Sequence, residues 1–596
     1  MTDKKLTDKI LYVVLTLCTL GVLISVLWSL RHILLCCSDS LAEYIFARAQ
    51  HNFKWSFDRG MDFCLSRGRL GVIFPFVTAV RHLICMSGNY MACWLMQHLP
   101  VYLNVFLLSF IIGRRTKASY GLIFALSFLS FLQINGWHNL MICYPLDFMY
   151  GLFLCILALW LFQISMETKK KAVKIITRGI SAWLFYESMQ TYEAFLFISA
   201  VYAWLALCFH LKKNGFKKGA KGKARLFIRS ILHSAISLIP HFITAVAYLG
   251  IYVYIHAHPI VEDTGNDLST MGTFPGFVET LTVFSGGMFP MSNLLFPAVR
   301  IGTKSVGITS GMILRTVLAG IGILCAAVLI YRDKERGKHN RTLRVMAVAG
   351  IIGAVLFPAM HAATERYQGW VINEHQFGYV PTAICYYGWI VAASCIMGLV
   401  LNAASKKKVT KAIFAFIGFA GFTVCTLVTC MINQAIIDTG VGPANPNLSL
   451  RAQTYYALTR DMDFRNSGCD VLYLNGFSGV HGFIGYDELI IAAEFQGTQR
   501  PMLTFSAEEA EEMYAGASNP CEFRYDFDSY AGSLVPSNGD GDIRIVSATG
   551  GSYRVDYTET DGDHVTFDVT LLPWSSYLYD APETFDAESI DIGAIS

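Results

Sequence analysis

Nine long apolar runs separated by short basic clusters constrain the fold of this 596-residue chain more than any other feature. A helix needs about 20 residues to cross a bilayer, and only 15% of the residues are charged, whereas a soluble domain carries about a quarter. We therefore expect a mainly α-helical polytopic membrane protein, and exclude a soluble enzyme, a disordered chain and a small disulfide-rich scaffold. The runs lie near 10–30, 89–112, 118–134, 147–166, 226–255, 310–331, 343–361, 379–402 and 412–432.

Basic residues between the runs predict the orientation of the chain. The first run follows three lysines and lacks a small-residue cleavage site, so we interpret it as a retained anchor with a cytoplasmic N-terminus. Residues 179–211 lie between two basic clusters and must cross the membrane an even number of times, which predicts a short hairpin with its outer turn near Glu187 to Glu193. The total is about eleven spans. The run at 71–86, broken by Arg81 and His82, is expected to be re-entrant or to lie on the surface.

The chain divides by charge near residue 440. Residues 441–596 carry 25 acidic residues, seven arginines and no lysine, whereas residues 1–440 carry 40 basic and 19 acidic residues. A lysine-free acidic tail predicts an extracytoplasmic domain, and its alternating strand signals and one acidic helix indicate a small α+β fold. Cys469 and Cys521 could form a disulfide there. No cofactor is predicted firmly, although the acidic side chains could bind a divalent cation instead of serving solubility alone.

Residues 1–440 then form a membrane domain with external loops at about 31–88, 256–309 and 361–378, and we expect the chemistry on this face. Asp39 opens the first loop just beyond the first span, and Ser40 and Glu43 have the spacing of a helix capping box. Asp39 could be a reactive carboxylate, or it could only help to cap that helix.

Arginines in translocated segments are unusual, so their presence indicates an anionic ligand. Arg67 and Arg69 could offer two guanidinium groups to a phosphate, or could pair with nearby acidic residues and phospholipids. Arg366, near the outer end of a later span, could join them. Tyr192 and Glu193 on the short hairpin are candidate pocket residues, because an ionisable group at membrane depth normally faces a cavity.

In these features the chain resembles the polytopic glycosyltransferases of GT-C type that use polyprenyl-phosphate-linked sugars, particularly bacterial O-antigen and teichoic-acid glucosyltransferase-like membrane proteins. The resemblance rests on Ser38-Asp39-Ser40, on Arg67-Gly68-Arg69 and on the Thr191-to-Phe195 turn, within residues 10–440. It implies transfer of one sugar, with inversion, from a polyprenyl-phosphate donor to a surface glycan outside a bacterial cell membrane. Asp39 would be the base, Arg67, Arg69 and Arg366 would bind phosphate, and Glu43, Tyr192 and Glu193 would line the pocket.

Other interpretations remain open from the sequence. A lipid-linked glycan flippase or transporter, or a glycan ligase or polymerase, would also handle such lipids. His361 and Glu365, four residues apart, could share a helical face and hold a metal, although an ion pair is the preferred interpretation. Tyr367, Trp370, Phe377 and Tyr379 could form an interfacial aromatic belt or stack on sugar, and we prefer the belt. The basic loops lack the interleaved aromatic residues of a nucleic-acid site.

Overall fold

The fold is known from a computed structural model, whose described residues form two units that are treated separately below. Unit 1 comprises residues 1–31, 54–81 and 95–441, and unit 2 contains the C-terminal tail from residue 442. The described residues are 2–31, 53–86, 90–134, 139–144, 146–215, 222–258, 270–289, 292, 307–375, 378–403, 408–439, 471–475, 502–504, 507–518, 520–526, 531–536, 541–549, 552–558, 564–570 and 584–586.

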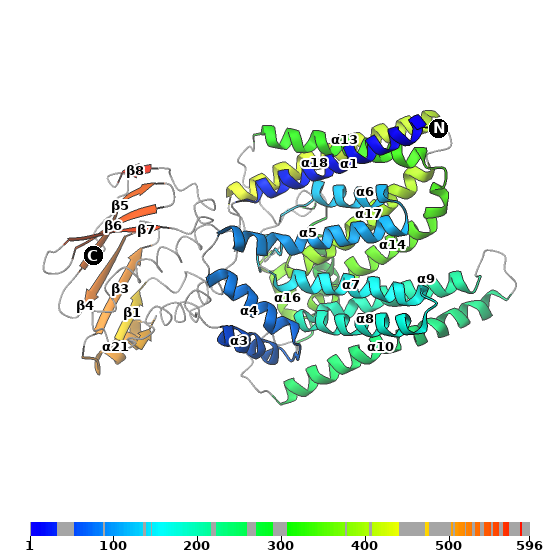
Figure 1. Ribbon diagram of the computed structural model, residues 1–596. Coiled ribbons are helices and arrows are strands. Elements are labelled where there is room, and N and C mark those ends of the chain that lie inside the picture. The colour runs from blue at the N-terminus through cyan, green and yellow to red at the C-terminus, as the bar shows by residue number, and fades with distance from the viewer. Residues whose placement is uncertain are drawn as a thin grey trace. The chain divides into compact units, whose positions relative to one another are not determined.

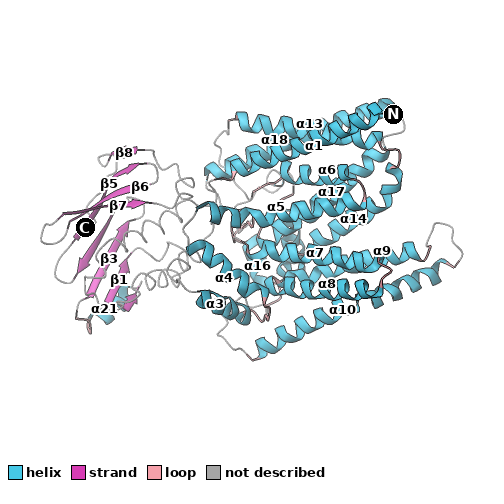
Figure 2. Ribbon diagram, in the orientation of Figure 1, coloured by secondary structure: helices cyan, strands magenta, loops and turns pink. Residues whose placement is uncertain are grey.

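Long α-helices make up unit 1 (Figures 1 and 2). In the described part of the chain, nine helical segments are long and apolar enough to cross a membrane. The structure therefore bears out a mainly helical chain with several membrane-spanning candidates. These segments lie in α1 (Thr2–Ser29), α5 (Tyr90–Arg115), α7 (Asp147–Glu167), η1 (Glu193–Ile198) with α9 (Ser199–Lys213), α10 (Lys223–Ala257), α13 (Ser310–Arg332), α14 (Arg336–Leu356) with α15 (Ala359–Ala363), α17 (Val380–Ala403) and α18 (Lys408–Thr439).

The remaining helices are shorter or less apolar. They are α3 (Phe53–Ser66), α4 (Ile73–Met86), α6 (Ala118–Ser130), α8 (Lys171–Thr191), α11 (Phe274–Gly286) and α16 (Glu365–Ile372). At 14 residues, α4 is about 21 Å long, too short to cross a hydrocarbon core of about 30 Å as a helix. The 13-residue α6 is mostly buried among other helices.

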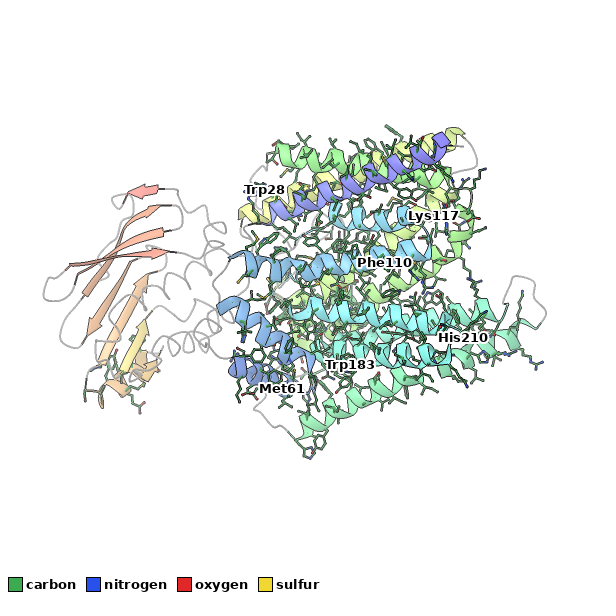
Figure 3. All side chains as sticks on the ribbon, viewed as in Figure 1. Trp28, Met61, Phe110, Lys117, Trp183 and His210 are labelled. Carbon is green, nitrogen blue, oxygen red and sulfur yellow. The ribbon has the colours of Figure 1, made fainter. Side chains whose placement is uncertain are left out.

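The basic clusters gather at one end of unit 1, which we call the basic end. Figure 1 shows the α5–α6, α7–α8 and α13–α14 connections there, together with the end of α9 and the starts of α10 and α1. In Figure 3, Lys117 and His210 lie toward this end, and Trp28 and Met61 lie toward the opposite end. The turn between α8 and η1, and the helices α3, α4 and α16, lie away from the basic end. This arrangement matches the segregation of basic residues to one side of a membrane.

Small residues allow close helix packing in unit 1. A Cβ atom on Gly350 of α14 would lie 2.5 Å from the carbonyl oxygen of Gly388 on α17, and a Cβ atom on Gly388 would lie 2.6 Å from that of Gly350. The two backbones therefore approach as closely as glycine permits, as is common between membrane helices.

Strands occur in the described tail, where one sheet has the order β2-β1-β3-β4-β5-β6-β7 and β8 pairs with β5. β1 pairs with β2 and β3 in parallel, and the other pairs are antiparallel. One helix, α21 (Ala507–Tyr514), accompanies them. The strands are β1 (Val471–Asn475), β2 (Met502–Thr504), β3 (Pro520–Asp526), β4 (Ala531–Pro536), β5 (Gly541–Thr549), β6 (Ser552–Thr558), β7 (His564–Thr570) and β8 (Thr584–Asp586).

Candidate functional site

The segment between α3 and α4, residues 67–72, is attached to the end of α8 by Arg69. The guanidinium of Arg69 donates from Nη1 to the carbonyl oxygen of Thr191 at 2.8 Å and pairs through Nη2 with the carboxylate of Glu193. Arg69 is 6% exposed, and its Nε has no hydrogen-bond partner among the described residues. The Arg67-Gly68-Arg69 element and the hairpin turn, predicted separately from the sequence, therefore meet in the structure.

Backbone groups of the same segment complete the attachment. The amide of Leu70 donates to Oε1 of Gln190 at 2.7 Å, and its carbonyl oxygen accepts from the Tyr186 hydroxyl at 2.7 Å. The amides of Val72 and Ile73, at the start of α4, donate to Oε2 of Glu187 at 3.3 and 3.2 Å. Glu187 thus caps a helix N-terminus from another helix, where a carboxylate also opposes the positive end of the helix dipole.

Two glycines let the segment turn and approach α8. Gly68 follows α3 with a φ of +66°, a left-handed conformation that favours glycine. A Cβ atom on Gly71 would lie 2.6 Å from Cβ of Gln190, so only glycine fits at this approach.

The hairpin turn also contacts the chain after α14. The Tyr192 hydroxyl and Nε2 of His361 are 2.6 Å apart, and both residues are buried. The ring centroid of His361 lies 4.8 Å from that of Tyr367 and 6.0 Å from that of Tyr379. We call these four residues the His361 cluster.

The prediction that His361 and Glu365 share a helical face required one continuous helix between them. The structure has no such continuous helix. α15 ends at Ala363, Thr364 is extended with φ −91° and ψ 143°, and α16 begins at Glu365. Thr364 forms an isolated bridge with Met271, and the Glu365 amide donates to the carbonyl oxygen of Thr270. The i, i+4 interpretation is therefore wrong, because pairing with residues 270–271 interrupts the helix. The hydrogen bond of His361 goes to Tyr192 rather than to Glu365.

Two arginines act electrostatically on Tyr367. Burial, and then the Glu193 carboxylate, raise the pKa of Tyr367 to about 12, whereas Arg366 and Arg67 act on the same group in the opposite direction. Both guanidinium groups are therefore within electrostatic range of Tyr367. Arg366 lies over the Trp370 ring at 5.1 Å, and Arg67 lies over the Phe63 ring at 5.4 Å.

The structure thus gathers five of the seven predicted site residues around one cluster. These are Arg67, Arg69, Tyr192, Glu193 and Arg366. Asp39 and Glu43 lie outside the described residues, and so do Phe377 and Cys469. Within the described stretches, no group of three His, Cys, Asp or Glu side chains could hold a metal ion.

Sequence reasoning missed the central place of His361 and its aromatic neighbours. Tyr367 is 2% exposed, and its ring contacts those of His361, Trp370 and Tyr379. The aromatic-belt interpretation does not describe Tyr367, because an interfacial belt residue contacts headgroups. The available signal was the density of aromatic residues beside a histidine at a span end.

No protein-family model, curated protein or solved structure matches this chain.

Proposed function

We propose that this chain is a membrane glycosyltransferase that moves a sugar from a polyprenyl-phosphate donor to a cell-surface glycan, with inversion, on the extracytoplasmic face. The observation that carries the proposal is that Arg67, which follows α3, and Arg366, on α16, both act electrostatically on Tyr367. Both α3 and α16 lie away from the basic end in Figure 1. Positive charge gathered on the side where basic residues are normally scarce favours an anionic substrate there.

The proposed reaction needs one base and a stabilised leaving group. The acceptor hydroxyl oxygen attacks the anomeric carbon, the bond from that carbon to the phosphate oxygen breaks, and Asp39 takes the hydroxyl proton. The polyprenyl phosphate leaves as an anion, so it requires neutralisation rather than protonation. Arg67 and Arg366 would supply this positive charge, since preorganised donors aimed at developing charge are effective catalysts.

Arg69 has a different role in this proposal, because its guanidinium is already bound to Glu193 and Thr191. It would be a positioning residue that holds the segment carrying Arg67 against the hairpin turn. Tyr192 and Glu193 would then position the loop and the His361 cluster, and Glu43 would lie beside Asp39 in the first loop.

The proposed topology has eleven spans. The apolar segment 118–134 and α8 would be added to the nine candidates. α8 runs between the basic end and the opposite end, as Figure 1 shows. α6 alone is about 20 Å long and too short to cross as a helix, so the non-helical residues 131–134 would complete that span. The N-terminus would then be cytoplasmic, and residues 441–596 would form an extracytoplasmic α+β domain on a bacterial cell membrane. Cysteine accessibility at positions placed in the loops would test this orientation.

The test is sugar transfer by the full-length chain in proteoliposomes that contain a labelled polyprenyl-phosphate sugar and a surface-glycan acceptor. Asp39→Asn should lower transfer by about 100-fold or more, as expected for loss of a general base. Arg67→Ala and Arg366→Ala should each lower it by about 100-fold, while the exposed Asp58→Asn in the same loop should not. Unchanged transfer in Asp39→Asn would reject the assignment, and lipid flipping without transfer would favour the transporter.

A further inference from the structure

A second, unassigned concentration of positive charge lies at the basic end of α8, α9 and α10. Residues 168–261 contain 13 lysines and arginines, and the acidic residues in this range are Glu187 and Glu193. Both carboxylates belong to the other end of α8, where they bind the segment that follows α3. They therefore do not neutralise the cations near the start of α8.

Four other basic residues at the same end have acidic partners. Lys117 pairs with Asp333, Arg115 with Glu167, Arg332 with Asp8 and Lys338 with Glu335. The difference between paired and unpaired cations matters because basic residues orient a membrane protein by their charge alone, so orientation does not explain why some of them lack acidic partners in the folded protein. Among the described residues, none of the lysines and arginines of α8, α9 and the start of α10 forms an ion pair, so an anion from outside the chain can bind them.

The helices bring these cations together. Lys174 and Arg178, one helical turn apart on α8, lie within electrostatic range of each other, and Lys174 is also within range of Lys213 at the end of α9. Arg178 is partly buried, and its Nε donates to Oγ of Ser165 at 3.4 Å, which fixes the side chain against α7. In addition, α8 begins without an acidic residue in its first turn and without a side-chain cap. Lysines at a helix N-terminus are unfavourable unless an anion balances them.

A buried histidine beside these cations is incompletely hydrogen-bonded. His210 is 8% exposed and lies within electrostatic range of Lys174, Arg178 and Lys213. Its Nε2 lies 3.0 Å from Oγ of Ser237, and its Nδ1 has no partner among the described residues. Nδ1 of His210 is therefore a buried polar atom that lacks a partner among the described residues, and in the tautomer that carries its proton on Nδ1 it would donate to a phosphate oxygen.

We propose that the phosphate of an anionic membrane lipid binds here, held by Lys174, Arg178, Lys213 and His210. The neighbouring surface favours a lipid over a soluble phosphate. Ile175 and Ile176 of α8 and Ile228 of α10 are 69%, 58% and 64% exposed, so acyl chains have apolar surface beside the cations. Basic sites between membrane helices are suited to anionic headgroups. This inference does not depend on the proposed transferase activity.

The full-length chain, purified in detergent, should bind phosphatidylglycerol more tightly than phosphatidylcholine with the same acyl chains, as measured by native mass spectrometry. Each of Lys174→Gln and Arg178→Gln should weaken phosphatidylglycerol binding about fivefold, and the double variant about 25-fold. Phosphatidylcholine binding should not change, which shows that the variants remain folded. Added salt should weaken phosphatidylglycerol binding to the wild-type chain more than to the double variant.

Lys338→Gln is the matched control, because it removes a lysine at the same end that already pairs with Glu335. It should leave phosphatidylglycerol binding within twofold of wild type. Equal losses in Lys338→Gln and Lys174→Gln would overturn the proposal, since the effect would then reflect net charge alone. Competition by inorganic phosphate at concentrations similar to those of the lipid would overturn the assignment to a lipid.

Discussion

Arg69 and Glu193 lie 124 residues apart in the chain and form an ion pair between the segment after α3 and the start of η1. The side chain of Arg69 is 7% exposed and that of Glu193 is 18% exposed, so solvent screens the pair weakly. Burial alone would lower the pKa of Arg69, but the carboxylate raises it above its ordinary value and the guanidinium stays charged. The pair therefore connects two elements that the sequence can only place on the same side of the membrane.

Arg69→Ala should destabilise unit 1 by about 3–5 kcal/mol, because it leaves the Glu193 carboxylate buried without its partner. Unfolding of the purified full-length chain in detergent would measure the change. Arg69→Ala combined with Glu193→Gln should cost less than the sum of the single changes, whereas additive costs would contradict direct coupling. Lys54→Ala, which breaks an exposed pair with Asp58, should cost at most about 1 kcal/mol.

Gly71→Ala should destabilise the attachment of the same segment, by about 1–3 kcal/mol, since its Cβ would lie 2.6 Å from Cβ of Gln190. Gly179→Ala in the middle of α8 is the control, because no atom lies within 4 Å of the added Cβ. That change should stabilise the chain by about 0.5–1 kcal/mol through higher helix propensity. Thermal unfolding of the two variants should therefore shift in opposite directions, and a stabilising Gly71→Ala would show that the close approach is wrong.

Hydropathy and basic clusters predicted the helical architecture because the length of each apolar run and the basic residues at its ends can be found directly in the sequence. Residues 179–211 lie between two basic clusters, so an even number of crossings was predicted, with a turn between them. In the structure α8 ends at Thr191, and η1 begins at Glu193. The same reasoning did not reveal that α6 is only 13 residues long and largely buried. A helix that is apolar on all sides has the same sequence pattern whether protein or lipid surrounds it.

The candidate site was less predictable. The sequence indicated Arg67, Arg69, Tyr192 and Glu193 individually, since arginine and glutamate are conspicuous near membrane spans. It did not indicate that Arg69 pairs with Glu193, because long-range pairing has no local signature. The contact between His361 and Tyr192 was hidden for a further reason. The break at Thr364 comes from pairing with Met271, far earlier in the chain, and residues 360–368 contain no glycine or proline that would mark it.

At the basic end, Asp333 should make the stability of unit 1 sensitive to acid. Burial would raise the pKa of its carboxyl, but hydrogen bonds from Lys117 and from the Glu335 amide lower it below its ordinary value of 3.8. A lowered folded-state pKa means that the stabilisation is complete above about pH 4–5 and is lost as the pH falls through the folded value. Asp333→Asn should therefore cost about 1 kcal/mol at pH 7 and progressively less below pH 4, measured by unfolding across that range. A cost that stays constant to pH 2 would contradict the role of this carboxylate, and the exposed Glu374→Gln should have no effect at pH 7.

The contact between Tyr192 and His361 should matter for both stability and transfer. Tyr192→Phe keeps the ring that packs against Phe148 and Phe357 but removes the hydroxyl 2.6 Å from Nε2 of His361. Because Nδ1 of His361 already has no partner among the described residues, both ring nitrogens would then be buried without one, at a cost of about 1–3 kcal/mol. Tyr254→Phe on the exposed face of α10 should change stability by less than about 0.5 kcal/mol.

If the His361 cluster positions the proposed site, Tyr192→Phe should also lower sugar transfer at temperatures where the variant is fully folded. Adding His361→Phe to Tyr192→Phe should lower transfer little further. Full transfer by folded Tyr192→Phe would show that the contact serves stability alone.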